Sequence, residues 1–87
     1  MEIIETSIFS RQVQALLQEE DYRQLQSALV LRPDFGALIP GGGGLRKMRW
    51  AGQGHGKRGG VRVLYYWAVS QDRILMLLIM RRASRMT

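Results

Sequence analysis

The first third of the chain places apolar residues every three or four positions, which is the period of an amphipathic helix. The first apolar stripe predicts a helix over about residues 7–17, with Ile8, Phe9, Val13, Leu16 and Leu17 on its core side. Thr6 or Ser7 can cap the N-terminus of this helix through a side-chain hydroxyl.

A second stripe, Tyr22, Leu25, Ala28 and Leu29, predicts a second helix. Glu19, Glu20 and Asp21 mark its N-terminus, where the helix dipole favours negative charge. The helix should end before Pro33, because the residue that precedes a proline is excluded from the helical conformation.

Four other segments have the composition and period of β-strands, and loops or turns rich in glycine, proline or polar residues separate the later ones. The strands are predicted at residues 2–5, 45–50, 61–69 and 74–80. Alternation with a period of two places Lys47 and Arg49 on one face of their strand, opposite Met48 and Trp50. In the next strand Arg62 shares a face with Leu64 and Tyr66, opposite the face of Val61 and Val63.

This order of elements predicts one α+β domain over residues 1–87. The last three strands are joined by short connections, so they should form an antiparallel meander to which the N-terminal strand adds. The expected fold is therefore a small antiparallel sheet with the two N-terminal helices packed on one face.

Charge divides the chain into two unlike parts. Residues 1–43 hold six acidic and three basic side chains, whereas residues 44–87 hold ten basic and one acidic, for a net charge of +6. Such segregation indicates a polyanionic partner for the second part. The absence of cysteine, the acidic N-terminus and a longest apolar run of seven residues favour a cytoplasmic protein without membrane association.

Residues 54–59 match the G-x-G-x-x-G pattern of dinucleotide-binding loops, but a strand follows them where that site needs a helix. We interpret the segment as a basic loop in which Lys57 and Arg58 contact the backbone of nucleic acid. His55 is the single histidine and there is no cysteine, so no metal site and no cofactor is expected.

The remaining chemistry lies on the strands. If the segments at 45–50 and 61–69 pair, Lys47, Arg49 and Arg62 can converge on one face of the sheet. Three fixed cations can bind a phosphate and stabilise the charge that develops when a phosphodiester is attacked. The alternative is that the three are solvated cations on an open sheet face, and the spacing does not decide between these interpretations.

Two motifs, Leu-Arg-Lys-Met-Arg-Trp at 45–50 and Gly-Gly-Val-Arg-Val-Leu-Tyr-Tyr-Trp at 59–67, occur together. In this combination the chain resembles the HigB branch of the RelE-type toxins, over about residues 2–80. The resemblance implies a toxin of a bacterial type II toxin–antitoxin module, which cleaves mRNA in the ribosomal A site through attack of a ribose 2′-hydroxyl. It also implies three partners: the ribosome, mRNA and a cognate antitoxin, often of helix-turn-helix type.

Carried over by position, the resemblance implies catalytic roles for Lys47, Arg49, Arg62 and Arg82, and RNA-binding roles for Arg46, Lys57, Arg58 and Arg81. Relatives usually continue through an aromatic or basic segment, in place of which this sequence has residues 80–87. A second interpretation is therefore a catalytically weak homologue that binds antitoxin, RNA or the ribosome without cleavage. A third and weaker interpretation is a DNA-binding accessory protein. A helix-turn-helix protein needs a basic recognition helix, whereas both predicted helices are acidic to neutral.

Overall fold

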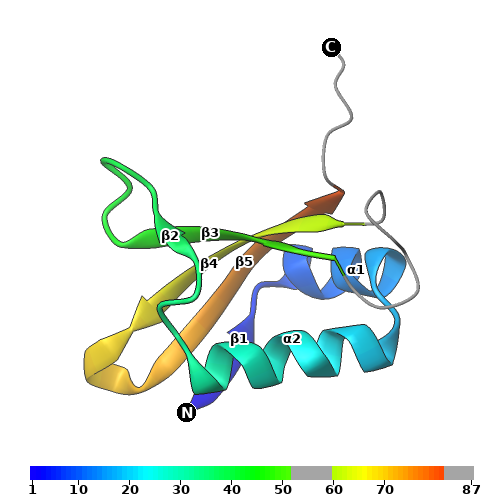
Figure 1. Cartoon of the computed structure of the whole chain (residues 1–87), viewed down its shortest axis with the longest axis horizontal. Coiled ribbons are helices and arrows are strands. Elements are labelled where there is room, and N and C mark those ends of the chain that lie inside the picture. Colours follow the sequence, from blue (N-terminus) through cyan, green and yellow to red (C-terminus); the bar gives the residue numbers. More distant parts are fainter. Residues whose placement is uncertain (52–59, 82–87) are drawn as a thin grey trace.

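The computed structural model describes residues 1–51 and 60–81 and confirms the predicted α+β fold (Figure 1). Its described helices and strands are β1 (Glu2–Glu5), α1 (Ser7–Leu16), α2 (Glu19–Leu31), β2 (Ala37–Leu38), β3 (Leu45–Trp50), β4 (Val61–Ala68) and β5 (Arg73–Arg81). A short 3₁₀ turn at Val69–Gln71 joins β4 to β5. Among these residues, no helix combines the length and the apolar character needed to cross a membrane.

The five described strands form one sheet in the order β1-β5-β4-β3-β2. The predicted antiparallel meander of β3, β4 and β5 is confirmed. The prediction of a wholly antiparallel sheet is wrong, because β1 pairs with β5 in parallel. The short strand β2, which is not among the predicted strands, adds to β3 as a further edge strand.

The start of α1 is tied to an irregularity in β5. Leu64 pairs with Leu78 and Tyr65 with Met76, so Leu77 is the extra residue of a β-bulge. The Thr6 hydroxyl accepts a hydrogen bond from Phe9 N–H at 3.0 Å and donates one to the Leu77 carbonyl at 2.9 Å. Thr6 thus caps the helix, as predicted, and fixes it to the sheet.

Glu5 joins the first strand to both helices. Its carboxylate accepts hydrogen bonds from the Ser10 hydroxyl of α1 and the Tyr22 hydroxyl of α2. Burial, reinforced by the hydrogen bond and the charge of Glu5, raises the pKa of Tyr22 well above the ordinary tyrosine value. This contact sets how the helix pair lies on the sheet.

Both helices pack on the same face of the sheet, and Figure 1 shows them together on one side of the strands. The helix residues buried there are Phe9, Val13, Leu17, Leu25 and Leu29. They meet the buried sheet residues Met48, Val61, Val63, Tyr65, Ile74, Met76 and Ile79.

The sheet face turned away from α1 and α2 is called the open face below. By the strand registers it carries Leu45, Lys47, Arg49, Arg62, Leu64, Tyr66, Leu75, Leu78 and Met80. Cations and apolar side chains thus share a surface that neither helix covers.

Candidate functional site

The antiparallel pairing of β3 with β4 brings the three predicted strand cations together on the open face. Arg49 lies directly opposite Arg62, and Lys47 lies opposite Leu64, two residues further along. All three side chains are exposed and line one pocket of about 460 Å³. We call this the cation pocket; its described lining is Phe35, Ala37, Lys47, Met48, Arg49 and Arg62.

The cation pocket contains positive charge without an acidic counterpart. Side chains directly opposite each other in an antiparallel pair have Cβ atoms about 4.5–5.5 Å apart, and like charges there are destabilising. Among the described residues, no ion pair includes Lys47, Arg49 or Arg62. The described residues therefore offer no counter-charge to Arg49 and Arg62, and an anion bound between them would relieve their repulsion.

Four ion pairs between described residues lie elsewhere in the fold. They join Glu2 to Arg73, Glu20 to Arg23, Asp34 to Arg32 and Asp72 to the N-terminal ammonium group. No carboxylate is among the described residues that line the cation pocket. The described lining of the pocket therefore has donors that can bind a phosphate and no carboxylate that would repel it.

An aromatic residue that was not among the predicted site residues also lines this pocket. Phe35 is 44% exposed although it is large and apolar. Its ring makes an edge contact with Trp50, with centroids 6.4 Å apart and planes inclined at 66°. Phe35 lies in a turn without periodicity, so the only signal in the sequence is an aromatic residue between Asp34 and Gly36.

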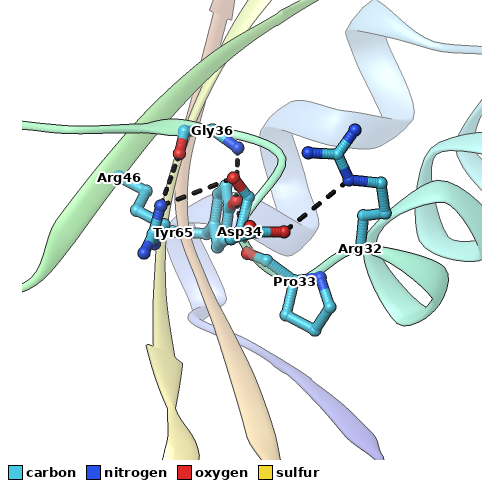
Figure 2. Close-up of polar contacts among 6 residues, drawn as sticks. All are labelled: Arg32, Pro33, Asp34, Gly36, Arg46 and Tyr65. Carbon is cyan, nitrogen blue, oxygen red and sulfur yellow. Dashed lines mark hydrogen bonds and ion pairs between the residues drawn. The ribbon is translucent and has the colours of Figure 1, made fainter.

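Two side chains of the sheet hold the turn that carries Phe35 (Figure 2). The Tyr65 hydroxyl accepts a hydrogen bond from Gly36 N–H and donates one to the Pro33 carbonyl, both at 2.7 Å. The Arg46 guanidinium donates to the Gly36 carbonyl, also at 2.7 Å. We call this arrangement the Tyr65–Arg46 clamp.

The clamp is closely packed. A Cβ atom on Gly36 would lie 2.8 Å from both the Lys47 carbonyl oxygen and a ring carbon of Tyr65. Burial raises the pKa of the Tyr65 hydroxyl, although its hydrogen bond to Gly36 and the charge of Arg46 act in the opposite direction. The hydroxyl therefore stays protonated, so it can accept from Gly36 N–H and donate to the Pro33 carbonyl at the same time.

No family model matches the chain. In the part of the chain that the structure describes, no group of three or more histidine, cysteine, aspartate or glutamate residues is placed to hold a metal ion. The arrangement suits binding of an anion by cations that two paired strands bring together.

The remaining predicted site residues are not part of the cation pocket as described. Arg46 alternates with Lys47 on β3, and its guanidinium contacts the carbonyls of Gly36 and Asp34. Arg81 is exposed at the end of β5 opposite Val61, so it alternates with Met80 of the open face. Lys57, Arg58 and Arg82 lie outside the described residues. All these roles, and those of the three pocket cations, stay predictions.

Proposed function

We propose that the protein is the toxin of a type II toxin–antitoxin module, a ribosome-dependent endoribonuclease that cleaves mRNA. The observation that carries the proposal is the convergence of Lys47, Arg49 and Arg62 on one pocket of the open face. The sequence resemblance to the HigB branch gives the reaction class, and the cytoplasm is the expected site of action.

The proposed chemistry suits a catalyst built from cations. The ribose 2′-hydroxyl gives its proton to water as its oxygen attacks the adjacent phosphorus. The bond to the 5′-oxygen breaks and that oxygen takes up a proton, so a 2′,3′-cyclic phosphate and a 5′-hydroxyl result. The nucleophile belongs to the substrate, so the protein needs to align the reacting atoms and stabilise the added negative charge. Removal of one such donor typically lowers the rate about 10²–10³-fold.

The three cations differ in what they can do at the phosphate. Arg49 and Arg62 each present a planar guanidinium that can donate two parallel hydrogen bonds to phosphate oxygens. Lys47 presents a compact ammonium group, which can hold the leaving 5′-oxygen and supply its proton. In this assignment the two arginines orient the phosphate and Lys47 assists departure.

The test is induced expression in a bacterial host, with wild type compared with Arg62→Ala and Arg49→Ala. Wild type should arrest growth and create new 5′ ends in translated messages, as detected by primer extension, and both variants should do neither. Both variants are expected to fold, because removal of either arginine relieves the like-charge repulsion between them. Equal arrest by wild type and Arg62→Ala would contradict the catalytic assignment.

A second candidate is a non-catalytic homologue that binds antitoxin, RNA or the ribosome. It is favoured by the apolar content of the open face, where Leu64, Tyr66, Leu75 and Leu78 are only partly buried and Met80 is 41% exposed. Such a surface is typical of a site that a partner covers. Primer extension separates the two candidates, because a binding module leaves no new 5′ ends.

A further inference from the structure

We propose that Phe35 is a stacking platform for a nucleobase of the RNA strand whose phosphate lies on Lys47, Arg49 and Arg62. The inference rests on the proposed RNA-directed function and adds a subsite to it. It comes from the position of Phe35, which lines the cation pocket together with the three cations.

The ring of Phe35 is available to a ligand. Its side chain is 44% exposed, whereas the core aromatic residues Phe9 and Tyr65 are fully buried. The contact with Trp50 is close to T-shaped, so it can occupy at most one face of the Phe35 ring. Trp50 itself packs against the core, which gives the rim aromatic a fixed support.

The backbone on both sides of Phe35 is held before any ligand binds. Tyr65 binds Pro33 on one side and Gly36 on the other, and Arg46 binds the Gly36 carbonyl. Phe35 N–H also donates to the Arg32 carbonyl at 2.9 Å. A ring carried by an ordered turn loses little conformational freedom on binding, which strengthens its contribution to affinity.

Cations beside an exposed aromatic ring match the two parts of a nucleotide. The phosphate needs fixed positive donors, and the base needs a flat apolar surface next to them. Stacking accepts any base, because every base has a π face, and it requires a base that is free of a duplex. The substrate class is therefore single-stranded RNA, held at one phosphate and one neighbouring base.

The experiment measures the affinity of the full chain for two short fluorescent RNAs by anisotropy. One is a single-stranded hexanucleotide, and the other has the same sugar–phosphate backbone with abasic residues. The variants are Phe35→Ala, Phe35→Leu and Phe35→Trp. Leu38→Ala is the matched control, because Leu38 is 56% exposed on the neighbouring β2 and is not among the residues that line the pocket.

Phe35→Ala and Phe35→Leu should each weaken binding of the hexanucleotide about tenfold or more, and leave the abasic RNA unaffected. Phe35→Trp should retain affinity, Leu38→Ala should match wild type, and Arg62→Ala should weaken both RNAs. Full affinity of Phe35→Leu would reveal a general apolar contact and overturn the inference. The inference is also overturned if the wild type binds both RNAs equally or binds neither.

The outcome is distinguishable from failure of the proposed function. If wild type prefers the hexanucleotide through Phe35 but leaves no new 5′ ends in translated messages, cleavage is refuted and the stacking subsite stands. If messages are cut by wild type and by Phe35→Ala at the same rate, and the two bind the hexanucleotide equally, the stacking subsite is refuted and cleavage stands.

Discussion

Replacement of Tyr65 by phenylalanine is the most direct test of the clamp that holds the Phe35 turn. The change removes one oxygen atom from a side chain with no exposed surface and keeps the ring in the core. It leaves Gly36 N–H without its buried acceptor and the Pro33 carbonyl without its donor.

The expected loss of stability follows from these two hydrogen bonds. A buried donor left unsatisfied costs about 1–3 kcal/mol, and a lost hydrogen bond that water can partly replace costs about 0.5–1.5 kcal/mol. We expect Tyr65→Phe to lower the free energy of unfolding by about 2–3 kcal/mol. A chain of this length has a total of about 4–13 kcal/mol, so the effect should lower Tm by roughly 10–20 °C.

The assay is urea unfolding followed by circular dichroism, with Tyr66→Phe as the matched control. Tyr66 is the next residue on β4 but lies on the open face, and its hydroxyl has no hydrogen-bond partner among the described residues. The control should change stability by less than about 0.5 kcal/mol. Equal destabilisation by the two variants, or a loss below about 0.5 kcal/mol for Tyr65→Phe, would refute the reasoning.

Two further predictions concern the same fold. The free energy of unfolding should fall as pH rises above the ordinary tyrosine pKa of 10. The pKa values of Tyr22 and Tyr65 are raised in the folded protein, so above this pH both residues ionise in the unfolded chain first. The unfolded state then binds fewer protons than the folded state, and rising pH favours unfolding. Tyr22→Phe should reduce this decline, as measured by urea midpoints at increasing pH. An unchanged slope would contradict the conclusion that burial raises the pKa of Tyr22. In the second prediction, Gly36→Ala should lower the free energy of unfolding by about 1–3 kcal/mol, because the added Cβ clashes with Lys47 and Tyr65. Gly43→Ala should lower the free energy of unfolding by only about 1 kcal/mol in urea titrations, because its Cβ would meet open space and the cost comes only from its φ of 68°. A larger loss for Gly43→Ala than for Gly36→Ala would contradict the close packing around Gly36.

The helices and long strands were predictable because each repeats its pattern over enough residues to define a face. Residues 7–17 and 19–31 repeat with the helical period, and β3 begins and ends where alternation places it. The direction of β1 was not predictable, because it depends on pairing with β5 across the whole chain. β2 spans two residues, which is too short for any period, and the bulge at Leu77 lies in a run that is apolar on both faces.

The part of the cation pocket that depends on the alternation of side chains along a strand was predictable. Lys47 and Arg49 share a face because they are two residues apart, and pairing with β4 adds Arg62. The place of Phe35 depends on hydrogen bonds to Tyr65 and Arg46, which are remote in sequence, so no local pattern could indicate it. The same bonds give Arg46 a structural contact that its basic character did not suggest.

The position of β5 in the sheet has a consequence for how the chain folds during synthesis. β5 is the last described strand to be translated, yet it lies between β1 and β4. Ile74, Met76 and Ile79, all fully buried, complete the surface on which the helices pack. The buried core that α1, α2 and the sheet share therefore cannot be completed until translation has passed residue 81.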